Sequence, residues 1–282
     1  MNFNAYYNGE FTRIDDLKIP LSDRSVYFGD GIYDAFIGRN GKIYLKEAHL
    51  LRFFANAERM DLSPTVSHSD MERILDRLVC EFSGNEFFLY AQLSRKSEFR
   101  SHTYNDGSSS NLLVTISPIE TKRYDTPLNL ITYEDLRYEL CHIKTLNLLP
   151  SVLASKAASR QNCDEAVFFR GKTVTECAHS NLFILKDGVL ITHPRDNHIL
   201  PGITRQRFIE IAKELSVKTV EAKFTLEDLI NSDAIIITST SKLAKTGILK
   251  NSKDRSFSTN ILALNLCKAM EDDYLNSTKT TN

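Results

Sequence analysis

The segment Cys141-His142-Ile143-Lys144-Thr145-Leu146-Asn147 decides how this chain of 282 residues is interpreted. It lies between a strand-like segment and a long helix-like segment, so Lys144 has an apolar setting that is unusual for lysine. A lysine in such a place can simply extend its amine to solvent. Partial burial also lowers a lysine pKa toward the free amine that Schiff-base chemistry needs. Lys144 is therefore a candidate for covalent chemistry.

The sequence around this lysine predicts a domain that begins near Leu128. Strands are predicted at Leu128–Tyr133, Glu165–Phe169, Asn181–Leu185, Val189–Thr192 and Ala234–Thr238. Helices are predicted near Leu148–Ser159, Thr204–Leu215 and Asn260–Tyr274. Because the strands come in groups and do not strictly alternate with helices, the fold class is α+β and not a doubly wound Rossmann sheet.

The first part of the chain predicts a sheet with two helices. Strand-like segments are Ala5–Thr12 around an Asn8-Gly9 turn, Ile32–Tyr44 turned at Asn40-Gly41, Phe87–Leu93 and Leu112–Ser117. The helix Lys46–Met60 presents Leu50, Phe53, Phe54 and Ala57 on one face. A capping box from Ser69 to Glu72 predicts the start of a second helix, with Met71, Leu75, Leu78 and Val79 inward. The polar stretch Arg95–Ser110 predicts a loop, and Glu120–Thr126 predicts a domain boundary.

Bulk composition excludes several classes of protein. The formal net charge is −1 with both signs scattered, which disfavours a nucleic-acid partner. The N-terminus is polar rather than signal-like, and no apolar run is long enough for a membrane span. The cysteines are an odd set without CxxC spacing: Cys80, Cys141, Cys163, Cys177 and Cys267. We therefore expect no metal site, no complete disulfide framework and a cytoplasmic location.

Other local features have ordinary structural interpretations when each is taken alone. The segment Phe28-Gly29-Asp30-Gly31 lacks both the GxGxxG fingerprint and the Walker lysine, which favours a tight turn. Glu176, in a short strand, and Arg52, on the first helix, would by default be solvated. Pro201–Thr204 predicts a helix start, and Ile237–Ser241 predicts a strand that ends in a hydroxyl-rich turn. Both could bind an anion or serve only as caps.

In their order and spacing, however, these segments resemble the fold-type IV pyridoxal-phosphate enzymes. That family includes D-amino-acid aminotransferases, branched-chain aminotransferases and aminodeoxychorismate lyases. The resemblance runs along nearly the whole chain and is strongest at 23–33, 143–149, 173–176 and 200–205. It implies a two-domain α+β architecture with a small N-terminal domain, 1–120, and a larger C-terminal domain, 121–282. It also implies a pyridoxal 5'-phosphate site at the domain interface.

The resemblance also assigns roles to residues. Lys144 would carry the cofactor and move a proton between the substrate α-carbon and cofactor C4′. Glu176 would hold the proton of the pyridine nitrogen, so that the ring accepts electrons. The remaining residues implied to bind the cofactor, at its phosphate, are Arg52, Ile203, Thr204, Ser239 and Thr240.

Substrate recognition is implied by another part of the chain. Arg100 and His102 are similar to the Arg-x-His pair that binds the α-carboxylate in D-amino-acid aminotransferases, together with Tyr33. In that family the loop reaches a neighbouring subunit, so a homodimer is expected. Ile37 stands where the branched-chain subgroup usually has arginine. His179 departs from the usual small residues after Glu176 and could line the substrate pocket.

The predicted activity is therefore a ping-pong transamination through pyridoxamine phosphate, from a D-amino acid such as D-alanine to a 2-oxo acid such as 2-oxoglutarate. Three alternatives remain at this stage. Two use the same cofactor: branched-chain L-amino-acid aminotransferase and aminodeoxychorismate lyase. The third is a non-catalytic binding protein that kept the fold, which the joint presence of Lys144 and Glu176 disfavours.

Overall fold

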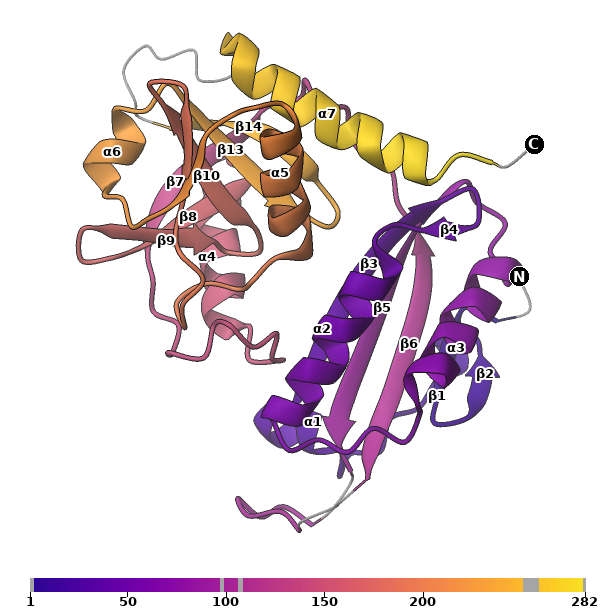
Figure 1. The fold of residues 1–282 in the computed structure, drawn as a ribbon. Helices are drawn as coiled ribbons and strands as arrows, with labels where there is room; N and C mark the ends of the chain where they lie inside the picture. The colour runs from indigo at the N-terminus through magenta and orange to yellow at the C-terminus, as the bar shows by residue number, and fades with distance from the viewer. Residues whose placement is uncertain (1–2, 97–98, 106–108, 251–258, 281–282) are drawn as a thin grey trace. The chain divides into compact units, whose positions relative to one another are not determined.

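Two compact units make up the chain (Figure 1). The computed structural model describes residues 3–96, 99–105, 109–250 and 259–280. The first unit contains Met1–Thr121, Ile143–Asn147 and Asn276–Asn282, and the second contains Lys122–His142 and Leu148–Leu275. The sequence predicted a division between residues 120 and 121. It did not predict that the segment carrying Lys144 and the C-terminal segment would return to the first unit.

An antiparallel sheet covered by two helices forms the first unit. Its strands, among the described residues, follow the order β2-β1-β6-β5-β3-β4, and each neighbouring pair is antiparallel. The strands are β1 (Ala5–Tyr7), β2 (Glu10–Thr12), β3 (Gly31–Arg39), β4 (Lys42–Ile43), β5 (Glu86–Arg95) and β6 (Ser110–Pro118). The helices are the 3-10 helix η1 (Ile14–Asp16), α1 (Arg24–Phe28), α2 (Lys46–Arg59) and α3 (His68–Glu81).

The core of the first unit lies between the sheet and α2 and α3, which cover the same face of β3, β5 and β6 in Figure 1. The helical periodicity predicted which side chains of these helices face inward. The structure confirms it for five of them, which are fully buried: Leu50, Phe53, Met71, Leu75 and Leu78. A fully buried side chain of this size contributes about 1.5–3 kcal/mol.

The predicted capping box was misplaced by two residues. Helix α3 is capped by Ser67, whose hydroxyl accepts from the Asp70 amide (3.1 Å). The Asp70 carboxylate in turn accepts from the Ser67 amide (3.0 Å). Ser69 already lies inside the first turn, so the proposed pair of Ser69 and Glu72 is wrong. Both pairs have the required spacing of three, and only the extended backbone of Ser67 identifies the cap.

The second unit is built on a mixed sheet. Within the described part of the chain its strand order is β12-β11-β10-β13-β14-β7-β8-β9. The strands are β7 (Leu128–Glu134), β8 (Glu165–Arg170), β9 (Thr173–Cys177), β10 (Asn181–Lys186), β11 (Val189–Thr192), β12 (Thr219–Glu221), β13 (Ala234–Ser239) and β14 (Leu243–Leu249). The helices are α4 (Leu149–Arg160), α5 (Ile203–Glu214), α6 (Leu226–Ile230) and α7 (Ile261–Ser277). Antiparallel pairs such as β10 with β13 outnumber the parallel ones, which confirms the α+β prediction.

Strand β14 was not predicted, and its composition explains why. It contains Lys245, only 2% exposed, and Gly247, so it has no clear strand pattern. A Cβ at Gly247 would lie 2.5 Å from Leu130 Cδ1, so glycine permits the close pairing of β14 with β7. The described helices include none that is long and apolar enough to cross a membrane.

Candidate active site

Lys144 lies on a short segment that pairs with the start of β3. The Tyr33 amide donates to the Lys144 carbonyl (2.9 Å), and the Leu146 amide donates to the Gly31 carbonyl (3.0 Å). A Cβ at Gly31 would lie 2.5 Å from the Leu93 carbonyl oxygen, so glycine is required there. Gly29 has a φ of +62° and accepts from the side chain of Asn147 (3.1 Å). The glycine-rich segment 28–31 therefore binds the segment that carries Lys144 through hydrogen bonds to Leu146 and Asn147.

The side chain of Lys144 packs on an aromatic platform. Its Nζ lies 4.3 Å from the centre of the Tyr33 ring. Tyr33 stacks on Tyr90 at 5.5 Å, and the Tyr90 hydroxyl donates to Gln92 Oε1 (2.8 Å). Burial raises the pKa of Tyr90 to about 12, so its hydroxyl stays protonated. Lys144, which is predicted to carry the cofactor, and Tyr33, which is predicted to contact the substrate, are therefore neighbours.

Arg52 is oriented by a buried carboxylate on β3. Its Nε and Nη2 donate to the two oxygens of Asp34 (2.9 and 2.7 Å), and His49 Nδ1 lies 2.8 Å from Asp34 Oδ1. Burial alone would raise the pKa of Asp34, but Arg52 and then His49 outweigh it and hold that pKa well below its usual range. Burial lowers the pKa of His49, and its contact with Asp34 opposes this change. Sequence reasoning predicted Arg52 and missed this support.

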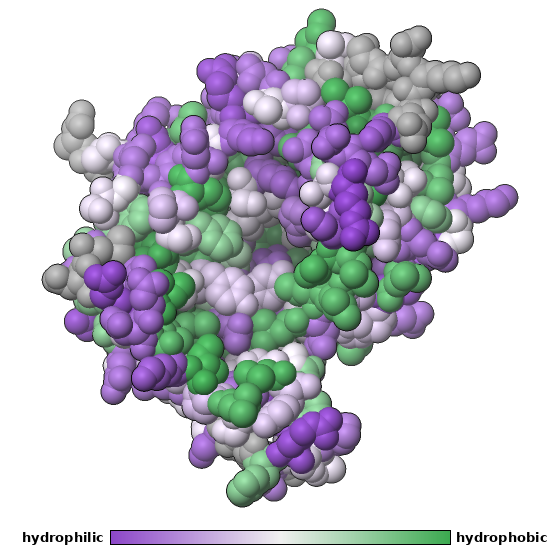
Figure 2. Space-filling model, turned by 180° about the vertical axis from the view of Figure 1, so that it is seen from behind, coloured by the Kyte–Doolittle hydropathy of each residue, from purple (hydrophilic) through white to green (hydrophobic). Residues whose placement is uncertain are grey.

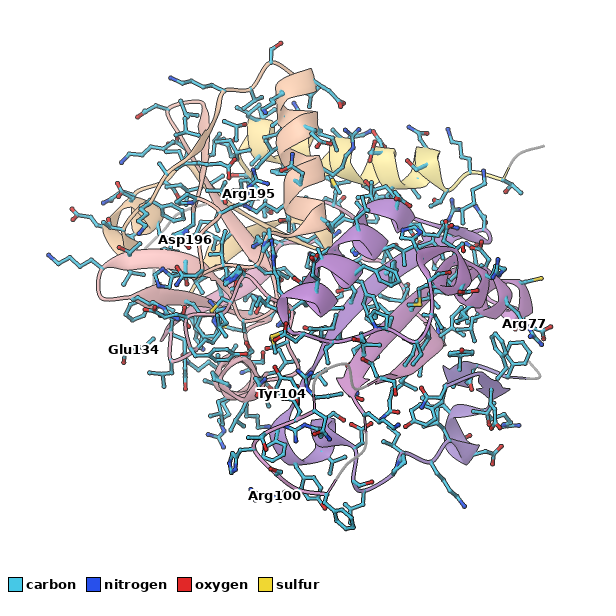
Figure 3. The ribbon with its side chains drawn as sticks, turned by 60° about the horizontal axis from the view of Figure 1, so that its bottom comes forward. Arg77, Arg100, Tyr104, Glu134, Arg195 and Asp196 are labelled. Atoms are coloured by element: carbon cyan, nitrogen blue, oxygen red, sulfur yellow. The ribbon has the colours of Figure 1, made fainter. Side chains whose placement is uncertain are left out.

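The loop between β5 and β6 carries Arg100 and His102, both of which are exposed. Arg100 is labelled in Figure 3. The backbone of the loop is held by Arg24, which is buried and pairs with Asp30 (2.8 Å). Arg24 Nη1 donates to the Ser101 carbonyl (2.6 Å), and its Nη2 donates to the His102 carbonyl (3.4 Å). Arg24 belongs to the motif that carries the family resemblance, and here it fixes the loop while the two predicted substrate-binding side chains extend outward.

Contacts with aromatic rings also hold this loop. The Arg100 guanidinium lies 5.2 Å from the Phe28 ring, which also contacts the His102 ring (5.4 Å). Tyr104, labelled in Figure 3, lies under the Arg95 guanidinium at 3.6 Å. Phe28 thus contacts both Arg100 and His102, the two residues proposed to share a role.

In the second unit, Glu176 is buried at the end of β9 and accepts several hydrogen bonds. Arg137 Nη1 donates to its Oε1 (2.5 Å), and Asn181 Nδ2 donates to its Oε2 (2.8 Å). The Leu200 amide lies 3.2 Å from both oxygens. Burial raises the pKa of Glu176, and Arg137 opposes this rise. Arg137 and Asn181 were not predicted as site residues.

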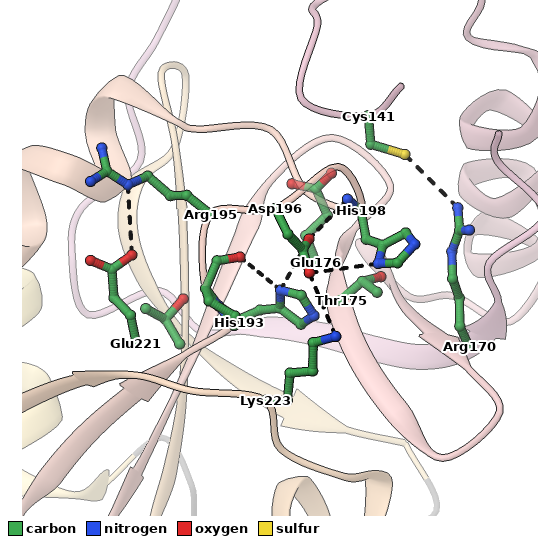
Figure 4. A network of polar contacts seen from close by, with 12 residues as sticks. Cys141, Arg170, Thr175, Glu176, His193, Arg195, Asp196, His198, Glu221 and Lys223 are labelled. Carbon is green, nitrogen blue, oxygen red and sulfur yellow. Dashed lines mark hydrogen bonds and ion pairs between the residues drawn. The ribbon is translucent and has the colours of Figure 1, made fainter. Parts of the chain in front are cut away.

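The segment 193–198 contributes a carbonyl to Arg137, the partner of Glu176, and carries ion pairs around Asp196, which Figure 4 shows. Arg137 Nη2 donates to the His198 carbonyl (3.1 Å). Asp196 lies 3.7 Å from His193 Nδ1, 3.6 Å from His198 Nδ1 and 3.7 Å from Lys223 Nζ. These contacts fix the carbonyl that positions the Arg137 guanidinium against Glu176.

The N-terminus of α5 lies close to Glu176 because of Asn181. The helix begins at Ile203, and a Cβ at its N-cap, Gly202, would lie 2.0 Å from Asn181 Oδ1. The first amides of a helix have no acceptor within the helix, so those of Ile203 and Thr204 can bind an anion. Residue 181 also pairs with residue 238 at the end of β13, directly before Ser239 and Thr240. The predicted carboxylate, helix and hydroxyl groups thus meet at one end of β10.

His179 belongs to a polar cluster on the turn after β9. Its Nε2 lies 2.8 Å from Lys242 Nζ and 3.1 Å from Glu165 Oε2. Lys242 donates to the same Glu165 oxygen (2.6 Å), and so does the Ser180 hydroxyl (2.9 Å). Glu165 and Lys242 were not predicted, because residues scattered along a sequence give no sign of such a cluster.

Comparison with known proteins gives a family. A family model described as amino-transferase class IV matches residues 31–245. The chain is 38% identical over 238 residues to the D-alanine aminotransferase of Listeria monocytogenes serotype 1/2a (strain 10403S), covering 83% of this chain and 82% of that protein. It is 37% identical over 244 residues to the D-alanine aminotransferase of Staphylococcus epidermidis strain RP62A, covering 84% and 85%.

A solved structure shows the same fold at lower identity. The branched-chain aminotransferase of the archaeon Thermoproteus uzoniensis, solved with norvaline, is similar with a TM-score of 0.87 and 18% identity. The match covers 97% of this chain and 97% of that one. Because the identity is low, this likeness bears on the fold alone.

Proposed function

The chain belongs to the class IV aminotransferases, and from this premise we propose that it transfers the amino group of a D-amino acid, such as D-alanine, to a 2-oxo acid, such as 2-oxoglutarate. The choice of D-amino acids follows the relatives called D-alanine aminotransferases. The observation in the structure that best supports the chemistry is the Lys144 amine held 4.3 Å from the centre of the Tyr33 ring.

The residues present fit pyridoxal 5'-phosphate, the cofactor of this function. A pyridine nitrogen needs a buried carboxylate, and Glu176 is buried and oriented by three donors. A phosphate needs amides and hydroxyls, which the start of α5 with Ser239 and Thr240 offers, and Arg52 supplies a fixed cation. When bound, the cofactor supplies an electron sink for the α-carbon of the amino acid.

Each residue then has a distinct task. The Lys144 amine carries the cofactor and moves a proton to and from the substrate α-carbon. Glu176 keeps the proton on the ring nitrogen, and Arg137 opposes the rise in the pKa of Glu176 that burial causes. Arg100, His102 and Tyr33 hold the α-carboxylate, which selects the enantiomer that presents its α-hydrogen to Lys144. His179 lines the substrate pocket.

Borohydride trapping tests the assignment of Lys144. The purified protein is reduced in the presence of pyridoxal phosphate and digested, and the labelled peptide is identified by mass spectrometry. We expect the label on Lys144, and we expect D-alanine but not L-alanine to change the cofactor spectrum. A label on another lysine would contradict the assignment of Lys144. A faster spectral change with L-leucine would contradict the proposed substrate and favour a branched-chain enzyme. Pyruvate release from aminodeoxychorismate without an amino acceptor would favour the lyase.

We also propose that the protein acts as a homodimer. Several apolar side chains of the second unit are exposed: Leu136, Tyr138, Leu140, Leu149, Val152 and Leu153. Figure 2, which shows one face of the molecule, has apolar side chains gathered among the polar ones. Exposed apolar patches of this kind often mark an interface. The outward orientation of Arg100 and His102 supports a role for them in the neighbouring subunit.

A cytoplasmic location is proposed on the basis of the cysteines. All five are free, including the buried Cys177 and Cys267. Free thiols persist where the compartment is reducing. The proposed partners are small amino acids and 2-oxo acids, and neither a nucleic acid nor a membrane is part of the proposed function.

A further inference from the structure

Asp30 carries the carboxylate of a buried cluster of three charged residues in the first unit. Its Oδ2 accepts from Arg24 Nε (2.8 Å) and from Arg95 Nε (3.0 Å). The side chains of Arg24 and Arg95 are 5% and 3% exposed, and that of Asp30 is 12% exposed. Apolar side chains can often replace a buried ion pair without loss of stability, so the role of this cluster is to be sought in its geometry.

Arg24 connects this carboxylate to the loop that carries Arg100 and His102. Its Nη1 and Nη2 donate to three consecutive backbone carbonyls, those of residues 101–103 (2.6, 3.4 and 3.4 Å). The N–H donors of a guanidinium lie in one rigid plane, so the direction that Asp30 imposes at Nε also sets the direction of the other donors. The position of the loop backbone therefore depends on the pairing of Arg24 with Asp30.

The backbone of Asp30 connects the same carboxylate to β3, the strand that carries Tyr33. Asp30 directly precedes this strand, and its carbonyl accepts from the last amide of β5 (3.1 Å). Strand β5 in turn pairs with β3 along its whole length, which includes the pairing of residues 33 and 92. The loop and Tyr33 thus both attach to Asp30, the loop through Arg24 and Tyr33 along the strand.

We propose that Asp30, acting through Arg24, is the positioning residue of the α-carboxylate site. It sets Arg100 and His102 relative to Tyr33, so that one carboxylate can accept from all three. This inference rests on the proposed transamination, in which these three residues bind the α-carboxylate. That carboxylate does not react, so its contacts are equally strong in the ground state and the transition state. Their loss raises KM and leaves kcat unaltered.

Two matched variants of the holoenzyme test this role. Arg24→Met and Arg95→Met each remove one buried arginine and leave the other paired with Asp30, so the two substitutions change the charge of the cluster equally. Arg24→Met releases the carbonyls of residues 101–103. Arg95 donates instead to the carbonyls of residues 60 and 61, at the end of α2, so Arg95→Met leaves the loop attached to Asp30.

Stopped-flow half-reactions with D-alanine, and calorimetry with propionate, which lacks the amino group, measure the effect. We expect Arg24→Met to raise both the half-saturating D-alanine concentration and the Kd of propionate by about tenfold or more, and to change the maximal rate by about twofold or less. Arg95→Met, which removes the contact with the Tyr104 ring, should change each quantity by about threefold or less. Asp30→Asn should behave as Arg24→Met does.

Cofactor affinity and thermal unfolding separate positioning from a general loss of structure. Both arginine variants should bind pyridoxal phosphate as the parent does in a fluorescence titration. Asp30→Asn leaves two buried guanidiniums without a counter-charge, and if it does not fold, the arginine variants decide. Arg24→Lys keeps the charge of the cluster but not the planar fork, so it should also raise the D-alanine requirement, and it replaces Arg24→Met if that variant does not fold.

The outcomes distinguish this role from the proposed function. Equal changes in Arg24→Met and Arg95→Met, no change in either, or a lower maximal rate at unaltered half-saturation would overturn the positioning role. If the parent enzyme converts D-alanine in that case, transamination stands. If the parent does not convert D-alanine, the proposed function itself fails and the role of Asp30 falls with it.

Discussion

Two of the residues proposed to bind the cofactor, Arg52 and Glu176, are each held in position by an oppositely charged side chain elsewhere in the sequence. Asp34 holds Arg52, and Arg137 holds Glu176, and both contacts are buried ion pairs. Removing one member of a buried ion pair is costly because the other charge remains without compensation. The function of the predicted residues therefore depends on charges that the sequence alone would place at the surface.

Arg137→Met should lower the stability of the protein and should lower its turnover of D-alanine in a pH-dependent way. Without its cation the pKa of Glu176, already raised by burial, should rise further, so the carboxyl becomes protonated over a wider pH range. We expect unfolding to become easier by about 3–5 kcal/mol and D-alanine turnover to fall, with partial recovery as pH increases. Urea unfolding and a pH–rate profile measure these effects. Arg137→Lys is the control that keeps the charge, and identical profiles for the two variants would contradict this account.

His49 should make the stability of the protein depend on pH. Burial lowers its pKa from 6.5, so as pH falls below about 6.5 the unfolded chain takes up a proton before the folded one does. The free energy of unfolding should then decrease by up to about 1.4 kcal/mol per pH unit between pH 6.5 and the lowered value. Urea unfolding at several pH values should show a shallower decrease in His49→Asn. A residual slope is expected from His193, whose pKa burial also lowers; an unchanged slope would exclude His49 as a source.

At the scale of the elements, regular segments could be predicted and irregular ones could not. The hairpins and amphipathic helices of the first unit show clear periodicity, and the structure has them near the predicted bounds. Strand β12 and helix α6 were missed because they are short. Strand β14 was missed because Lys245 and Gly247 interrupt its apolar pattern. The candidate lysine, carboxylate and helix start followed from motifs. Their partners Asp34, Arg137 and Asn181 did not, because those contacts exist only after the strands have paired.

Gly202→Ala tests the link between α5 and Glu176. The added Cβ would lie 2.0 Å from Asn181 Oδ1, so Asn181 must move away from its contact with Glu176. We expect pyridoxal-phosphate binding to weaken by about 1–3 kcal/mol, measured by fluorescence titration. Ser67→Ala, which removes the cap of α3, should cost about 1 kcal/mol of stability and leave cofactor affinity unaltered. Equal cofactor affinity in the Gly202 variant and the parent would show that the helix start does not bind the phosphate.

At the scale of the whole molecule, the proposed homodimer would use the apolar side chains that are exposed on the second unit. Leu149 and Val152 on α4 are 68% and 58% exposed. If α4 lies in the proposed dimer interface, Leu149→Lys/Val152→Lys should convert the dimer to monomers in sedimentation velocity. Leu215→Lys, at an exposed leucine after α5, should have no such effect. A double variant that sediments as the parent does would place the interface elsewhere.

The order of synthesis matters for a unit that is assembled from separate parts of the chain. The first unit includes Ile143–Asn147 and the last residues of the sequence, and Asn40 donates to the carbonyl of the fully buried Thr278 (3.0 Å). Domains usually fold from the N-terminus while translation continues. Here the N-terminal part of the first unit can complete its native contacts only after the segment around Thr278 has been synthesised, so those contacts stay incomplete while residues 122–275 are made.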